Sequence, residues 1–229
     1  MTLPLNFIEK QTQDDVSASV ILLHGLGASG HDFASVPDFL QLPQDLGIRF
    51  IFPHAPQQKV TINGFMEMPA WYDIYGFSPE SPQDRDGIEH SSHWVQQMIE
   101  WEMSRGMPSD RIVLAGFSQG GAIALYTGIY YDVPLAGVIG LSTYLPLHSD
   151  LGVQNKPVQK DRRFFMAHGK QDPVIPIEHA RTSKALLEHY YHHVIYREYD
   201  MAHEVCPQQL MDIRQVLTDW LKAPINNED

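Results

Sequence analysis

The sequence predicts an α/β fold with an open, mostly parallel sheet and helices on both of its faces. Short apolar runs alternate along the chain with longer amphipathic segments, as strands alternate with crossover helices in such a sheet. The apolar runs are nearly continuous, which is typical of strands that are covered on both faces. Because no stretch rich in Pro, Gly or Ser separates two such blocks, residues 1–229 are expected to form a single domain.

Six segments are predicted as strands, because each is a short run rich in β-branched and aromatic residues that stops at a turn signal. In chain order they are residues 20–23, 49–52, 111–117, 136–141, 163–167 and 194–199. Four longer segments place apolar residues at the spacing of an amphipathic helix. They are residues 88–103, 119–131, 177–190 and 210–221.

Composition limits the class of partner. Acidic residues outnumber basic ones by 28 to 16, and the net charge of −12 disfavours binding to nucleic acid or anionic lipid. The longest apolar runs are far shorter than the roughly 18 residues that span a bilayer, so stable membrane insertion is not expected. The chain has a single cysteine, Cys206, and shows no secretion signal, so the expected location is the cytoplasm.

Ser118 is the candidate nucleophile. Residues 116–120 read Gly-Phe-Ser-Gln-Gly and match the pattern G-x-S-x-G, with a predicted strand before them and a predicted helix after them. In this motif the serine occupies a tight turn, and the small residues two positions away prevent a clash. Ser118 Oγ would project from the carboxyl edge of the sheet, and the N–H of Gln119 would point at a developing oxyanion.

Asp172 and His203 are the candidates for the acid and the base that a serine nucleophile needs. In α/β-hydrolases the three residues follow in the order serine, acid, histidine. Asp172 follows the fifth predicted strand and precedes Pro173, whereas His203 follows the sixth strand. Both loops leave the carboxyl ends of strands, where open α/β sheets bind ligands. Asp172 could also be an ordinary turn residue before proline.

A second oxyanion donor is expected in the glycine-rich turn after the first strand, where residues 24–27 read His-Gly-Leu-Gly. The N–H of Leu26 is the candidate, and the turn lacks the spacing of a nucleotide-binding loop. His24 and His168 each end a strand before glycine and are expected to be structural residues in the floor of the site. The histidines within residues 189–193 are too loosely spaced for a metal site, so neither a metal nor a cofactor is expected.

Seven short motifs together resemble the acyl-protein thioesterase/carboxylesterase family of α/β-hydrolases. They are His24-Gly-Leu-Gly, Phe52-Pro-His-Ala-Pro, Val60-Thr-Ile-Asn, Trp71-Tyr-Asp-Ile, Gly116-Phe-Ser-Gln-Gly-Gly, His168-Gly-x-x-Asp-Pro and Met201-x-His. The resemblance extends over nearly the whole chain. It implies the α/β-hydrolase fold without a large cap domain, and it implies the triad and the two oxyanion donors named above.

The resemblance also implies hydrolysis of esters or thioesters of short to medium acyl chains through an acyl-enzyme intermediate. Some members of the family cleave fatty thioesters from proteins and others act on lysophospholipids. A small acyl ester or thioester, an acylated protein and a lysophospholipid therefore all stay open as substrates, and a homodimer stays open as the assembly. A non-catalytic binding protein of the same fold is the alternative from another class, although no member of the triad is missing.

Residues 53–82 form a long excursion without a helical or strand period, rich in Pro, Gly, Met and aromatic residues. Loops of this length in compact domains are usually functional or disordered, and the aromatic residues favour order. Five apolar side chains of the excursion are predicted to form one wall of an acyl groove: Ile62, Phe65, Met66, Met68 and Trp71. The alternative is that they pack as a satellite cluster of the core.

Overall fold

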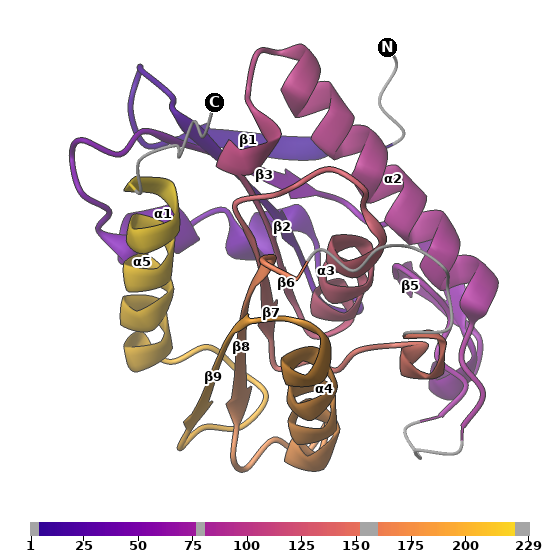
Figure 1. Ribbon diagram of the computed structural model, residues 1–229. Helices are drawn as coiled ribbons and strands as arrows, with labels where there is room; N and C mark the ends of the chain where they lie inside the picture. The colour runs from indigo at the N-terminus through magenta and orange to yellow at the C-terminus, as the bar shows by residue number, and fades with distance from the viewer. Residues whose placement is uncertain (1–4, 77–80, 152–159, 223–229) are drawn as a thin grey trace.

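The computed structural model describes residues 5–76, 81–151 and 160–222 (Figure 1). Its main sheet has seven strands in the order β1-β3-β2-β6-β7-β8-β9. The strands are β1 (Phe7–Gln11), β2 (Ala18–Leu23), β3 (Ile48–Pro53), β6 (Ile112–Phe117), β7 (Gly137–Leu141), β8 (Arg163–Gly169) and β9 (His193–Tyr199). All neighbours are parallel except β1, which pairs antiparallel with β3. The predicted mostly parallel sheet is thus confirmed.

Helices cover both faces of the sheet, as the sequence predicts. Figure 1 shows α1 (Val36–Leu40) and α5 (Pro207–Lys222) together on one side, with α2 (Arg85–Ser104) and α3 (Gln119–Tyr130) on the other. The helix α4 (Ile177–Tyr190) belongs to the α2 and α3 side, because Leu187 joins the same buried cluster. The edge strand β1 was not predicted, because it includes Glu9 and Lys10 and is only partly buried, so it is not an apolar run. The helix α1 was not predicted, because its five residues are too few to show a period.

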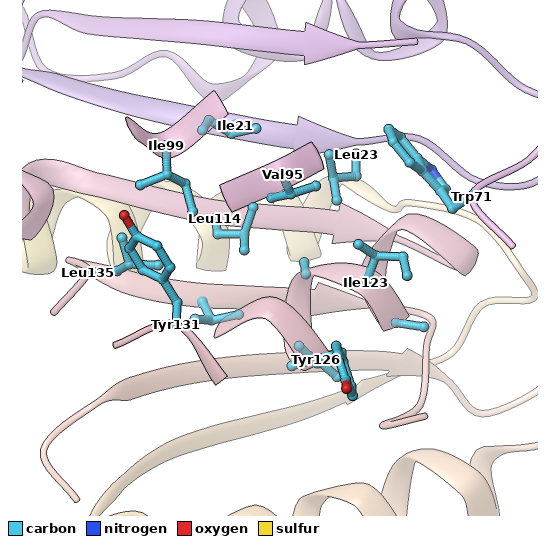
Figure 2. Packing of buried hydrophobic residues seen from close by; sticks show 14 of the residues in the cluster. Ile21, Leu23, Trp71, Val95, Ile99, Leu114, Ile123, Tyr126, Tyr131 and Leu135 are labelled. Atoms are coloured by element: carbon cyan, nitrogen blue, oxygen red, sulfur yellow. The ribbon is translucent and has the colours of Figure 1, made fainter. Parts of the chain in front are cut away.

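The two faces of the sheet bury two separate apolar clusters. Figure 2 shows the cluster under α2 and α3, where Val95 and Ile99 of α2 face Ile21 of β2 and Leu114 of β6. The buried side chains of α2 recur every three or four residues, which is why the helical period was legible in the sequence. Almost every residue of α3 is buried, so this helix lies at the centre of the molecule.

The excursion after β3 contains a small antiparallel hairpin, formed by β4 (Gln57–Val60) and β5 (Met66–Pro69). The chain reverses through Gly64 and Phe65, which have φ values of 66° and 62°. Most side chains of the hairpin are at least partly exposed, so its strands lack the alternation of apolar and polar residues that marks a half-buried strand. The part of the predicted excursion at residues 77–80 lies outside the described residues.

Candidate active site

Ser118 lies in the sharp turn between β6 and α3, with φ 53° and ψ −121°. A side chain at this φ is strained, so the surroundings must hold the turn in place. The N–H of Ser118 donates to the carbonyl of Leu141 (2.8 Å), and Thr143 Oγ1 donates to the carbonyl of Ser118 (2.7 Å). Both partners belong to the end of β7 and the loop that follows it, so the neighbouring parallel strand fixes the serine.

Two glycines make room for this turn. A Cβ atom on Gly116 would overlap the backbone of Gly120, and a Cβ atom on Gly120 would overlap the carbonyls of Leu23 and His24. The start of α3 therefore lies directly against the end of β2. This contact explains why the G-x-S-x-G pattern needs glycine on both sides of the serine.

The structure brings Ser118, His203 and Asp172 into one hydrogen-bonded chain. Ser118 Oγ lies 2.9 Å from His203 Nε2, and His203 Nδ1 lies 2.7 Å from Asp172 Oδ2. Because a carboxylate accepts hydrogen bonds, Nδ1 donates and the lone pair of Nε2 faces the serine hydroxyl. Ser118 and Asp172 are each only 8% exposed, so little water competes for these bonds. This arrangement can remove a proton from the serine.

The carboxylate of Asp172 is fixed from its other side. Its Oδ1 accepts the N–H groups of Val174 and Ile175, both at 2.9 Å. His168 lies behind it, fully buried, with Nε2 at 2.8 Å from the carbonyl of Ile175 and at 3.4 Å from Asp172 Oδ2. Burial lowers the pKa of His168, so its imidazole is neutral and supports the loop without adding a charge.

The predicted oxyanion donors lie on the two segments that meet at Gly120. Gln119 is the first residue of α3, whose first helical bond runs from Ala122 N to Ser118 O (3.0 Å). The N–H of Gln119 precedes that bond and has no partner of its own within the helix. Leu26 lies in the turn after β2, where Gly27 N donates to the carbonyl of Pro69 (2.8 Å).

The side chain of Gln119 has a role that the sequence did not reveal. Its Oε1 accepts the N–H of Trp71 (2.9 Å), and its Nε2 donates to the carbonyl of Tyr72 (2.6 Å). The amide thus ties the serine turn to the segment after the hairpin. No motif signals this contact, because the partners are backbone groups 47 and 48 residues away in the chain.

His24 connects the glycine-rich turn to its surroundings. Its Nδ1 donates to the carbonyl of Gly25 (2.7 Å), and its Nε2 accepts the N–H of Ala55 (3.0 Å). The indole Nε1 of Trp71 donates to the carbonyl of His24 (2.8 Å). Burial lowers the pKa of His24, which is consistent with a neutral structural imidazole in the floor of the site.

The five side chains predicted to form a groove wall do not share one surface. Trp71 is 1% exposed and belongs to the core, so the interpretation of its side chain as a wall residue is wrong (Figure 2). Phe65 and Met66 are each 63% exposed near the end of the hairpin. Ile62 and Met68 are half-buried, and a Cβ atom added to Gly27 would lie 3.8 Å from Met68 Sδ. Met68 therefore lies beside the glycine-rich turn, which Trp71 also contacts from within the core through its bond to His24.

A cavity of about 270 Å³ lies instead between the loops that follow β7 and β8 and the first turns of α4. Its lining includes Tyr144, Leu145, Val174, Ile175, Pro176 and His179, together with Gly76, Ser81 and Gln83. Val174 and Ile175 are the residues whose N–H groups hold Asp172, so the cavity lies beside the loop that carries Asp172; Ser118, Asp172 and His203 do not line it. None of the five predicted wall residues lines it.

Two further properties concern only the part of the chain that the structure describes. There, no group of three or more His, Cys, Asp and Glu side chains is placed to hold a metal ion. In residues 5–76, 81–151 and 160–222, no helix combines the length and the apolar character needed to cross a membrane.

The sheet, the strained serine turn and the order of the site residues define an α/β-hydrolase. A family model described as phospholipase/carboxylesterase matches residues 5–221. The chain belongs to this family and is a serine hydrolase of the esterase and thioesterase kind.

Similar proteins agree with this assignment. An acyl-protein thioesterase 1 of Neurospora crassa is 37% identical over 90% of this chain and 87% of its own length. The protein of the same name from Yarrowia lipolytica is 36% identical over 91% of this chain and 92% of its own. Among solved structures, acyl-protein thioesterase 2 of Zea mays matches with a TM-score of 0.83 and 26% identity, covering 94% of this chain and 99% of that one.

The contact at Gly120 gives a stability prediction. Gly120→Ala should lower the free energy of unfolding by at least about 2 kcal/mol, because the new Cβ meets backbone carbonyls that cannot rotate away. Gly64→Ala is the control, because a Cβ atom added there would have no neighbour within 4 Å. Only the φ of +66° disfavours alanine at this position, and it should lower the free energy of unfolding by about 1 kcal/mol. Urea denaturation measures both variants. Gly120 has no positive φ, so a loss no larger than that of Gly64→Ala would show that the contact with Leu23 and His24 does not decide the glycine.

Proposed function

We propose that the protein hydrolyses carboxylic esters or thioesters of short to medium acyl chains through an acyl-enzyme on Ser118. His203 is the base and Asp172 holds it in the correct tautomer. The observation that carries this proposal is the continuous hydrogen-bonded chain Ser118–His203–Asp172, with bonds of 2.9 and 2.7 Å. These residues come from three separate loops at one edge of the sheet.

The geometry supports a two-step reaction. Ser118 Oγ attacks the acyl carbonyl carbon while its proton passes to His203 Nε2, and Asp172 stabilises the imidazolium. The carbonyl oxygen takes up negative charge beside the N–H groups of Leu26 and Gln119. The tetrahedral intermediate then expels the alcohol or thiol, which takes the proton from His203. In the second step a water molecule loses a proton to His203 and attacks the acyl-enzyme. The second tetrahedral intermediate then expels Ser118 Oγ, which takes the proton back from His203, and the carboxylic acid is released.

The cavity beside the loop that carries Asp172 is our candidate for the acyl site. It has an apolar side, formed by Leu145, Val174 and Ile175, against which a methylene chain can be buried. It also has polar lining groups such as Tyr144 and His179. With a volume of about 270 Å³, it suits a short or medium chain better than a long one.

A protein thioesterase is the second candidate, and the relatives favour it. Acyl-protein thioesterases at 35–37% identity match about nine-tenths of this chain, so removal of a fatty acyl group from a protein cysteine is a reasonable substrate class. Release of palmitate from an S-palmitoyl peptide tests it directly. Octanoyl thioesters that turn over while the palmitoyl peptide does not would favour the small-substrate alternative.

The assignment of the nucleophile gives the first prediction for activity. Ser118→Ala should lower kcat for a p-nitrophenyl ester by roughly 10⁶, because the acyl-enzyme can no longer form. Ser104→Ala, at the exposed end of α2, is the matched control and should leave the rate unchanged. Circular dichroism checks that both variants fold. A folded Ser118→Ala protein that keeps more than about 1% of the rate would contradict the assignment.

The position of the acyl site gives a second prediction. Val174→Ala should lower kcat/KM for an octanoate ester about fourfold more than for an acetate ester. The change removes two carbons from a side chain that is 40% exposed, so it costs the long ester about one buried methylene, or about 0.8 kcal/mol. Phe65→Ala is the control from the predicted wall, since this side chain is 63% exposed near the end of the hairpin. It should not change the ratio of the two rates. The reverse result, with Phe65→Ala alone changing chain preference, would restore the hairpin as the groove wall.

A further inference from the structure

The glycine-rich turn after β2 is fastened to the sheet at its far end by a histidine that the mechanism does not use. Gly30 N donates to His54 Nδ1 at 3.1 Å. Gly30 lies tightly against the end of β3, because a Cβ atom there would overlap the carbonyl of Phe52. His54 follows β3 directly and is itself held by the bond from its N–H to the carbonyl of Asn6 (2.8 Å).

This bond requires one protonation state of the imidazole. A backbone N–H can only donate, so Nδ1 of His54 must carry a lone pair and the proton must sit on Nε2. Protonation would put an N–H group on Nδ1, and two donors would then face each other across 3.1 Å. The contact therefore exists only while His54 is neutral.

Several other hydrogen bonds also hold the turn between residues 24 and 30. Trp71 Nε1 donates to the carbonyl of His24, Ala28 N donates to the carbonyl of Gly25, and Ser29 N and Oγ donate to the carboxylate of Asp32. His24 holds its beginning through the bond to Ala55, and Gly27 N is bonded to Pro69 in the hairpin. Gly27 itself is exposed, so packing does not fix the middle of the turn. Leu26, the candidate oxyanion donor, lies between these anchors. A loss of the anchor at Gly30 would let the turn shift, and catalysis is sensitive to displacements of a fraction of an ångström at such donors.

We propose that His54 is a positioning residue for the hydrolytic reaction, whose neutral imidazole holds the glycine-rich turn so that Leu26 N–H faces the oxyanion. The proposal rests on the proposed function, because it takes Leu26 as a donor in ester hydrolysis. It assigns His54 no contact with the substrate. Acidification should weaken catalysis through His54 in addition to any protonation of the catalytic base.

The surroundings favour the neutral form at neutral pH. Burial lowers the pKa of His54, and the neighbouring His31, whose ring centroid lies 5.3 Å away, lowers it further when it is charged. His54 also interacts electrostatically with His24, and His24 interacts with the carboxylate of Asp32. His54 therefore becomes charged only below the ordinary histidine pKa of about 6.5, and the anchor is lost as the pH falls through that range.

The test compares His54→Asn with the wild-type enzyme over pH 5–9. The Oδ1 atom of asparagine can take the place of Nδ1 as acceptor, but the amide does not become protonated. We expect kcat/KM for a short p-nitrophenyl ester to agree with wild type within about twofold at pH 8. The ratio of variant to wild type should then rise severalfold as the pH falls to 5. His54→Ala has no acceptor for the Gly30 N–H, so its kcat/KM should be about tenfold lower than wild type at pH 8. This loss is smaller than the factor of 10² or more that removal of an oxyanion donor costs.

His31→Ala is the matched control, because it removes the imidazole next to His54 but leaves the acceptor of the Gly30 N–H in place. It should keep wild-type activity at pH 8. A ratio for His54→Asn that stays flat from pH 8 to pH 5, or a His54→Ala enzyme with wild-type activity at pH 8, would overturn the proposal. Thermal unfolding of each variant at both pH values shows whether a rate change reflects lost structure. Failure of the proposed function is distinguishable, because Ser118→Ala would then retain activity whatever the residue at position 54.

Discussion

The active site depends on one backbone constraint, the close contact between the start of α3 and the end of β2. Gly120 touches the carbonyls of Leu23 and His24, and no larger residue fits there. This contact sets Ser118 at φ 53° at the edge of the sheet and brings the first turn of α3 against the glycine-rich turn. The predicted nucleophile and both predicted oxyanion donors thus lie on two segments whose separation is fixed by backbone atoms in contact.

The parallel sheet supplies the remaining members of the site. Because β2, β6, β7, β8 and β9 run in the same direction, their loops leave from one edge, and residues up to 85 positions apart meet there. Each loop is held by bonds from its neighbours: Thr143 holds Ser118, Ile175 holds both Asp172 and His168, and Ala55 holds His24. The neutral buried histidines stiffen the site without competing with His203 for the charge of Asp172.

Much of this arrangement was predictable from the sequence, for identifiable reasons. Apolar runs such as residues 20–23 and the helical period around Val95 follow from burial, so the sheet and its long helices could be predicted. Ser118, Asp172 and His203 could be predicted from their residue types, their order in the chain and their positions after predicted strands. The structure brings them into one hydrogen-bonded chain. Whether they act as the catalytic triad stays a prediction until activity is measured.

The parts that could not be predicted lack a local signal. The hairpin at residues 57–69 is held mainly by backbone pairing, so its side chains show no period, and Trp71 looked like a loop residue although it is buried. The links from Gln119 to the backbone of residues 71–72, and from His54 to Gly30, involve backbone groups far away in the chain. Sequence patterns identify which side chains can do chemistry, but not which backbone groups hold them in place.

The central claim is that Ser118 Oγ forms the covalent bond of the acyl-enzyme. Covalent capture of this serine tests the claim most directly. A p-nitrophenyl phosphonate ester transfers its phosphonyl group to an activated serine and releases p-nitrophenol. The account predicts one phosphonyl group per chain, found by peptide mass mapping on Ser118, with hydrolytic activity lost in proportion to labelling. Cys206 follows His203 by three residues and is the only thiol in the chain. Labelling of Cys206 or of another serine with matching loss of activity, or full activity without a label, would contradict the account.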